Sequence, residues 1–212
     1  NVRVEGTDFV FDLKRPEGDL IADLRLPLPG RHNVENAVAA AAVTLEAGGT
    51  EEKLRSGLAS FRGIGRRFEI VLNEAGGPVV IDDYAHHPTE LEAAIGAARE
   101  LFPERRITGV FQPHLFSRTR DFVDGFAGAL DKLDEVVLLP IYPAREEPLP
   151  GVTSRLLLDK IYRAEKCLLE PEEVVEHLKN RGADVVLILG AGDIDQLVEP
   201  IAKTLKTTVN HG

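Results

Sequence analysis

Residues 79–88, Val-Val-Ile-Asp-Asp-Tyr-Ala-His-His-Pro, decide the fold of most of this chain. Three apolar residues typical of a buried strand lead into a polar loop, and Pro88 suits the first position of a helix because its missing N–H would have no partner there. The same order recurs to the end of the chain. The expected strands span 67–73, 78–82, 106–111, 135–140, 165–169 and 184–189, and the expected helices span 88–102, 118–132, 153–163, 171–181 and 193–206. This alternation predicts an α/β fold, with a Rossmann-like, open, mostly parallel sheet and helices on both faces.

The beginning of the chain has a different pattern. Alternating apolar residues before Pro29 predict a small antiparallel sheet of the β-hairpin type. A helix is expected from Asn33 to Ala47, and Thr50 is the expected N-cap of a second helix. The glycine-broken basic stretch after Phe61 then marks a boundary. We therefore predict two domains, residues 1–64 and 65–212.

Composition restricts the class of protein. The 212 residues are 43% hydrophobic and carry a formal charge of −10, which argues against binding nucleic acid or an anionic membrane by net attraction. No apolar run approaches the roughly 20 residues of a membrane span. The single cysteine, Cys167, excludes an internal disulfide and a zinc site built from cysteines. We expect a soluble, cytoplasmic protein, and because the sequence contains no methionine, we expect Asn1 to be an internal boundary of a longer protein.

The chemistry is expected in the loops that follow the strands, because the carboxyl ends of parallel strands meet at one edge of a sheet. Four polar loops qualify, namely 82–87, 112–120, 142–147 and 190–193. Asp82 and Asp83 can equally be solvated caps, whereas a ligand-binding role is favoured for His86 over His87. A metal site made of Asp83, His86 and His114 is conceivable, although its spacing matches no metal motif.

The arginines and glycines of these loops also allow two interpretations. Arg118 and Arg120 are expected in the first turn of a helix, where an anionic ligand would relieve their conflict with the helix dipole. Arg66 and Arg67 are more often a solvated charge run than a site. The stretch Gly190-Ala191-Gly192 lacks the third glycine of a dinucleotide fingerprint. For the loop residues Tyr142, Arg145 and Glu146, a ligand-facing and an exposed position are equally favoured.

Several motifs, taken in order, closely resemble the Mur ligases. These motifs are Gly30-Arg31-His32-Asn33-Val34-Glu35-Asn36-Ala37, Gly65-Arg66-Arg67-Phe68-Glu69, Asp82-Asp83-Tyr84-Ala85-His86-His87-Pro88-Thr89-Glu90, Phe111-Gln112-Pro113-His114, Ser117-Arg118-Thr119-Arg120-Asp121, Tyr142-Pro143-Ala144 and Gly190-Ala191-Gly192-Asp193-Ile194. The resemblance spans nearly the whole chain. It implies a cytoplasmic enzyme of peptidoglycan synthesis that joins L-alanine to UDP-N-acetylmuramate, using ATP and Mg²⁺ through an acyl phosphate.

The resemblance also implies roles for single residues. The residues implied to bind ATP are His32, Asn33, Asn36, Arg67 and Asp83, those implied to receive L-alanine are Tyr84, His86, His114 and Arg118, and those implied to take part in catalysis are Arg67, Asp83 and His86. No residue of this chain is implied to bind the metal. Leu115 departs from the pattern, because many relatives carry arginine there.

The chain lacks a phosphate-binding loop, because no glycine is followed by lysine. The resemblance therefore implies that residues 1–64 end a central ATP-binding domain whose phosphate loop and Mg²⁺ ligands lie upstream of Asn1. We expect the chain alone to be inactive, and its exposed former interior to favour self-association. The alternatives are an isolated, non-catalytic nucleotide- or metabolite-binding module and, less favoured, a scaffold.

Overall fold

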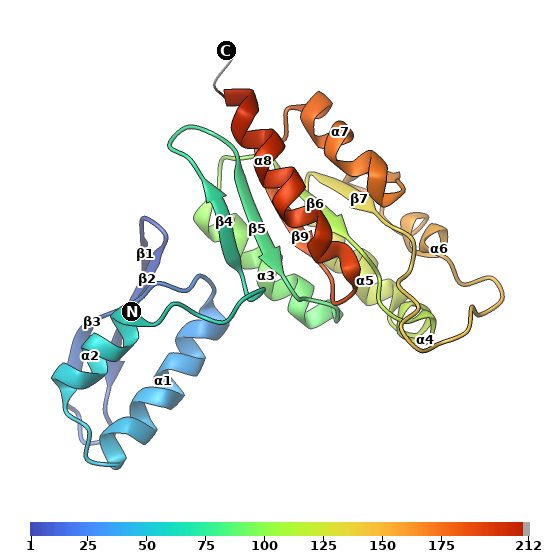
Figure 1. Cartoon of the computed structure of the whole chain (residues 1–212). Helices are drawn as coiled ribbons and strands as arrows, with labels where there is room; N and C mark the ends of the chain where they lie inside the picture. Colours follow the sequence, from blue (N-terminus) through green and yellow to red (C-terminus); the bar gives the residue numbers. More distant parts are fainter. Residues whose placement is uncertain (210–212) are drawn as a thin grey trace. The chain divides into compact units, whose positions relative to one another are not determined.

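The computed structural model describes residues 1–209, with side chains described up to Lys206. The chain divides into two compact units, named unit 1 and unit 2 (Figure 1). Unit 1 comprises residues 1–64 and 96–103, and unit 2 comprises residues 65–95 and those from 104 onward. The break after Ile64 lies in the glycine-broken basic stretch. That residues 1–64 end a central ATP-binding domain remains a prediction.

Unit 1 pairs a small antiparallel sheet with two helices. Its elements are β1 (Val2–Glu5), β2 (Asp8–Lys14), β3 (Leu20–Leu26), α1 (Arg31–Glu46) and α2 (Glu51–Ser60), with the strands in the order β1-β2-β3. Phe9 and Leu24 are fully buried against apolar residues of both helices. Thr50 is the N-cap of α2, as predicted, and its side chain accepts a hydrogen bond of 3.3 Å from the Lys53 N–H. Gly48, at φ +83°, follows the end of α1.

Unit 2 is built on a six-stranded sheet in the order β4-β5-β9-β6-β7-β8. The strands are β4 (Glu69–Asn73), β5 (Val79–Asp83), β6 (Ile107–Phe111), β7 (Glu135–Leu138), β8 (Glu165–Leu168) and β9 (Val185–Leu189). Only β4 runs antiparallel to its neighbour, so the predicted open, mostly parallel sheet is confirmed. Every residue of β6 and β9 is buried, as expected for strands covered on both faces.

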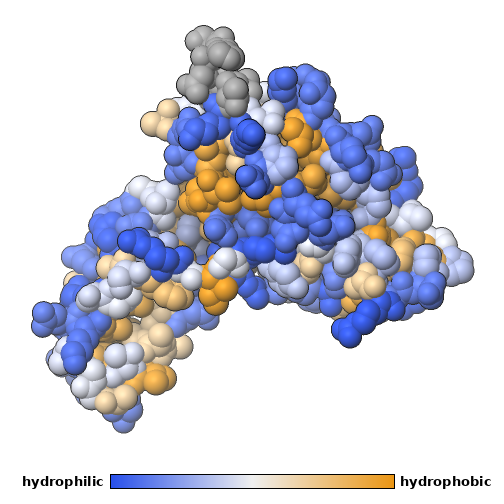
Figure 2. Space-filling model, viewed as in Figure 1, coloured by the Kyte–Doolittle hydropathy of each residue, from blue (hydrophilic) through white to orange (hydrophobic). Residues whose placement is uncertain are grey.

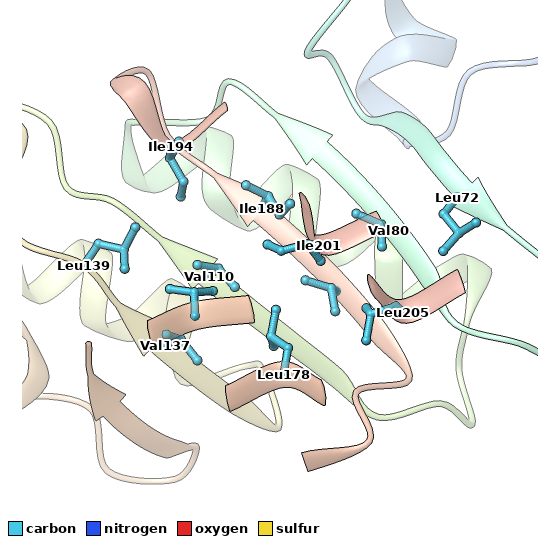
Figure 3. Close-up of a cluster of buried hydrophobic side chains, with 12 residues drawn as sticks. Leu72, Val80, Val110, Val137, Leu139, Leu178, Ile188, Ile194, Ile201 and Leu205 are labelled. Atoms are coloured by element: carbon cyan, nitrogen blue, oxygen red, sulfur yellow. The ribbon is translucent and has the colours of Figure 1, made fainter. Parts of the chain in front are cut away.

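Helices cover both faces of this sheet. They are α3 (Pro88–Leu101), α4 (Phe116–Asp121), α5 (Val123–Leu130), α6 (Ser154–Leu158), α7 (Pro171–Arg181), the 3₁₀ helix η1 (Asp193–Leu197) and α8 (Val198–Val209). Figure 1 shows α7 and α8 on one face and α3 and α5 on the other. Figure 3 shows how Ile201 and Leu205 of α8 and Leu178 of α7 pack on Val80, Val110 and Ile188 of the sheet. This core fixes the strands whose ends carry the candidate site.

Three predicted helices were wrong in extent. The helix predicted over 118–132 is two helices, because Phe122 leaves the helical conformation at φ −116° and ψ 18°. Its ring packs edge-on against His87 at 4.8 Å between ring centroids, a long-range contact that local periodicity does not show. The helix predicted over 153–163 ends at Leu158, and the helix predicted over 193–206 begins as a 3₁₀ turn.

Apolar side chains are exposed on unit 1. Figure 2 shows orange and pale atoms over the surface of this unit. The exposed large apolar residues of unit 1 are Leu20, Val38, Val43, Phe61 and Ile64. This surface is compatible with self-association, which remains a prediction. Among residues 1–209, no helix is both long and apolar enough to cross a membrane.

Candidate functional site

The loops at the carboxyl edge of the sheet in unit 2 are joined to one another. The Gly190 N–H donates to the Asp83 carbonyl at 3.2 Å, and the Gln112 N–H donates to the Leu189 carbonyl at 3.1 Å. The strands β5, β9, β6 and β7 are consecutive in the sheet, so the loops that follow them are neighbours. The edge is therefore a continuous polar surface built from segments far apart in the sequence.

Four ring side chains form a row along this edge. The Tyr84 and His86 ring centroids lie 5.2 Å apart, and those of His86 and His114 lie 6.0 Å apart. His114 stacks on Tyr142, with a centroid distance of 5.6 Å and an interplanar angle of 19°. The structure thus brings together three of the four residues predicted to receive L-alanine, and it adds Tyr142 to them.

Arg118, the fourth of these residues, lies within electrostatic reach of His114. Two buried nitrogen atoms of this pair, His114 Nδ1 and Arg118 Nη1, have no hydrogen-bond partner. Burial, followed by the charge of Arg118 and the proximity of His86, lowers the pKa of His114 below its usual range. A neutral imidazole therefore stands beside a permanent cation, and both offer unused polar atoms. This arrangement suits a ligand that carries a carboxylate.

The first-turn position predicted for Arg120 was wrong. The helix α4 has only six residues, so Arg118 lies within one turn of both ends, whereas Arg120 lies in the last turn, where a cation is favourable. Arg120 is exposed and forms an ion pair of 2.7 Å with Asp121. What distinguishes Arg118 is its buried, unpaired nitrogen atom.

Asp83 fastens the loop after β5. Its Oδ2 atom accepts a hydrogen bond of 2.8 Å from the Phe68 N–H, and its Oδ1 atom accepts one of 2.7 Å from the Ala85 N–H. These contacts hold the entry to β4 against the exit from β5. The predicted role of Asp83 toward the ribose or domain closure remains a prediction.

Sequence reasoning missed the contacts of Arg66, because two adjacent arginines are more often a solvated charge run than part of a site. The Arg66 guanidinium group donates to the Gly190 carbonyl at 2.8 Å and lies 3.3 Å from carboxylate oxygens of both Asp82 and Asp195. It also lies 5.1 Å from the centroid of the Tyr84 ring. The available signal was Asp82, since a carboxylate in a buried strand requires a cation nearby.

The surroundings of Asp82 shift the pKa of its carboxyl group. Burial raises the pKa of Asp82 to about 6, although the positive charge of Arg66 acts in the opposite direction. Asp82 is 4% exposed, and its Oδ1 atom has no hydrogen-bond partner. The carboxyl group therefore takes up a proton more readily than an exposed aspartate.

The residues predicted to bind ATP come from both units. His32, Asn33 and Asn36 lie on α1 of unit 1, where the Asn33 side-chain amide donates to the Pro29 carbonyl at 2.7 Å. Arg67 lies in unit 2, is exposed, and has its guanidinium carbon 6.0 Å from the Tyr84 ring centroid. Their combination in one nucleotide site remains a prediction.

The Gly190-Ala191-Gly192 loop owes its glycines to close packing. Gly190 has φ +148°, and a Cβ atom on Gly192 would lie 2.3 Å from Gln112 Oε1 and 2.7 Å from Tyr142 Cγ. Gln112 is fixed in turn, because its amide donates to Asp193 at 2.7 Å and accepts from the Ile194 N–H at 3.2 Å. The absence of a side chain at Gly192 therefore allows this loop to pack against the loops that carry Gln112 and Tyr142.

Replacing Gly192 by alanine is expected to lower the free energy of unfolding by about 2 kcal/mol, because the added methyl group overpacks this junction. Urea denaturation of the variant measures the loss. The control is Gly128→Ala in α5, where a Cβ atom meets nothing within 4 Å and helix propensity favours alanine by about 0.5–1 kcal/mol. Equal effects of the two substitutions would contradict the packing role of Gly192.

The alternative metal site of Asp83, His86 and His114 finds no support. Within the part of the chain that the structure describes, no group of three or more His, Cys, Asp or Glu side chains is arranged to hold a metal ion. Asp83 instead accepts two backbone hydrogen bonds, and His86 Nδ1 lies 2.9 Å from the Tyr84 carbonyl oxygen.

One protein family matches the segment of the chain that carries the loops of this edge. The family described as "Mur ligase, glutamate ligase domain" matches residues 66–192, which include all four loops. The chain belongs to the Mur ligase family. The matched residues include the four polar loops at the carboxyl edge of the sheet, whereas the motif Gly30–Ala37 lies at the start of α1 of unit 1.

Two curated relatives and one solved structure show which members of the family this chain is similar to. A UDP-N-acetylmuramate–L-alanine ligase of Porphyromonas gingivalis is 56% identical over 191 residues, covering 90% of this chain and 42% of the relative. One of the same name from Christiangramia forsetii is 47% identical over 205 residues, covering 97% of this chain and 45% of the relative. The crystal structure of a UDP-N-acetylmuramate-alanine ligase from Thermotoga maritima matches with a TM-score of 0.83 and 27% identity, covering 98% of this chain and 45% of that chain. The chain thus spans less than half the length of these Mur ligases.

Proposed function

We propose that this chain is part of an ATP-dependent ligase that joins L-alanine to UDP-N-acetylmuramate, and that the carboxyl edge of unit 2 receives L-alanine. One observation carries the proposal, namely the two buried, unpaired nitrogen atoms of His114 and Arg118. The names of the relatives support the choice of substrates.

The residues suit the chemistry of such a ligase. An amine that attacks an acyl phosphate must be held in place, and its own carboxylate must be neutralised. Arg118 would bind the carboxylate, and the neutral His114 would accept or donate a hydrogen bond beside it. Tyr84 and His86 would line the site beside the amino group of L-alanine. Arg67 would contact a phosphate of ATP.

Binding of ATP is proposed to involve other residues than those that receive L-alanine. His32, Asn33 and Asn36 would hold the adenine of ATP, and Asp83 would serve the ribose or domain closure. The chain contains no Gly-Lys pair, and its described residues contain no metal-ligand cluster, so the proposal assigns the phosphate loop and the Mg²⁺ ligands to residues outside this chain. The chain alone is then inactive. Use of ATP and a sugar nucleotide would place the ligase in the cytoplasm.

Replacing Arg118 by alanine in the complete ligase tests the proposal. Loss of a charge-assisted hydrogen bond of about 2 kcal/mol is expected to raise the KM for L-alanine about 30-fold and to leave the KM for ATP nearly unchanged. Steady-state kinetics with each substrate varied in turn measures both constants. Arg120→Ala is the matched control, because Arg120 lies on the same helix and is exposed. Equal effects on both KM values would refute the assignment.

A further inference from the structure

The loop between β7 and α6, residues 139–153, touches the candidate L-alanine site at two points. We propose that Tyr142 and Glu146 of this loop are positioning residues, which hold His114 and Arg118 in the geometry that receives the amino acid. The proposal rests on the proposed function and adds two residues to it. Neither residue is required to touch the substrate.

The first point of contact is Tyr142. Its N–H donates to the Pro113 carbonyl at 2.8 Å, and its carbonyl accepts from the Leu115 N–H at 3.0 Å. These two bonds extend the pairing of β6 and β7 by one bridge beyond the ends of the strands, between His114 and Tyr142. The stacked Tyr142 ring then leaves the imidazole of His114 little freedom to rotate.

The second point of contact is Glu146. One carboxylate oxygen accepts a hydrogen bond of 2.9 Å from the Ser117 N–H, and the other accepts one from the Ser117 hydroxyl. A turn closed by the Glu146 N–H and the Pro143 carbonyl at 2.9 Å presents the carboxylate, with Ala144 at φ +51° inside the turn. Ser117 directly precedes Arg118, so Glu146 fixes the backbone that carries this arginine.

The segment that carries His114 and Arg118 needs such support. The helix α4 has only six residues, too few to be stable by itself, and Leu115 before it adopts φ +71°, a strained value for leucine. Strained backbone persists only where its surroundings hold it in place. The Tyr142 carbonyl binds the Leu115 N–H, and Glu146 binds Ser117, so the loop restrains the segment on both sides of the strained residue.

The negative charge of Glu146 also acts on His114 and Arg118. This electrostatic effect must be separated from the hydrogen bonds of Glu146 with Ser117. It lies within electrostatic reach of His114 and Arg118. A glutamine at position 146 keeps an oxygen that accepts from the Ser117 N–H but removes the negative charge. Comparison of glutamine with alanine therefore distinguishes a positioning role from a purely electrostatic one.

Steady-state kinetics of the complete ligase tests the proposal. Glu146→Ala and Tyr142→Ala are each expected to raise the KM for L-alanine about tenfold, because displaced binding groups lose their alignment, while the KM for ATP stays unchanged. Glu146→Gln and Tyr142→Phe keep the hydrogen bond and the stacking, respectively, and are expected to stay within about threefold of the wild type. Glu147→Ala is the control, since Glu147 is the exposed neighbour of Glu146.

The outcomes separate this proposal from the function on which it rests. If Arg118→Ala raises the KM for L-alanine but the two alanine variants in the loop do not, the positioning role is wrong and the proposed function stands. If Arg118→Ala has no such effect, the proposed function itself fails. A Glu146→Gln variant as impaired as Glu146→Ala overturns the positioning role, because the charge would then be what matters.

Discussion

Replacing Arg67 by alanine in the complete ligase is expected to lower kcat/KM for ATP by about 10²- to 10³-fold, the usual cost of removing one donor that stabilises charge in a transition state. The reason lies in the contrast with Arg66. The Arg66 guanidinium is engaged by Asp82, Asp195 and Gly190, whereas the exposed Arg67 guanidinium has no ion pair or hydrogen bond within the described residues. Arg67 is thus the arginine of this pair that is available to a phosphate.

Steady-state kinetics with ATP as the varied substrate measures this effect. Arg62→Ala is the matched control, because Arg62 is an exposed arginine of the same basic stretch. Arg67→Lys should recover part of the activity, since lysine retains the charge but not the planar fork of donors. If Arg67→Ala and Arg62→Ala give the same small change, Arg67 does not contact ATP.

The fold of unit 2 could be predicted because its signals are local. The apolar strands and the Asp82-to-Pro88 loop with its following helix carry their own periodicity and start signals. The break at Phe122 was not predicted, because local periodicity carries no sign of it and the ring of Phe122 contacts His87 of a distant segment. The boundaries of helices were therefore less predictable than their existence.

The candidate site was predictable to a similar degree. Tyr84, His86 and His114 follow strands whose carboxyl ends lie at one edge of a parallel sheet, so their proximity follows from the topology. The contacts of Arg66 with Asp195 and of Glu146 with Ser117 join residues 129 and 29 positions apart, and no local pattern announces them. Sequence reasoning accordingly found the residues that face the edge and missed those that hold them.

The buried carboxylate of Glu135 should contribute strongly to the free energy of unfolding of unit 2. Glu135 lies at the start of β7, whereas the candidate site lies at the carboxyl ends of the strands. The Glu135 side chain is 4% exposed, and it accepts a hydrogen bond from Thr108 at 3.2 Å and contacts His177 Nε2 at 3.0 Å. Arg181 lies 3.3 Å away. Glu135→Ala is therefore expected to lower the free energy of unfolding by about 2 kcal/mol at neutral pH, because it removes the contacts of a buried carboxylate and leaves the buried Thr108 hydroxyl without its acceptor.

The three tyrosines of the chain all lie in unit 2, so their fluorescence during urea denaturation follows this unit. Glu165→Ala is a matched control, because Glu165 pairs with the same Arg181 but is exposed, and its loss is expected to cost at most about 0.5 kcal/mol. If both variants lost a similar unfolding free energy, the contacts of the buried Glu135 would be no stronger than those of the exposed Glu165.

The stability contributed by Glu135 should also depend on pH in a definite direction. Burial alone would raise the pKa of Glu135, but the hydrogen bond with His177 and the charge of Arg181 outweigh it, so the pKa in the folded protein lies below the ordinary value of 4.5. A carboxylate with a lowered pKa stabilises the folded state above its unfolded pKa, and this contribution is lost as the pH falls through the folded pKa. The difference in unfolding free energy between the wild type and Glu135→Gln should therefore shrink as the pH falls below about 4.5. A difference that grew as the pH fell below about 4.5 would mean that folding raises the pKa of Glu135 rather than lowering it.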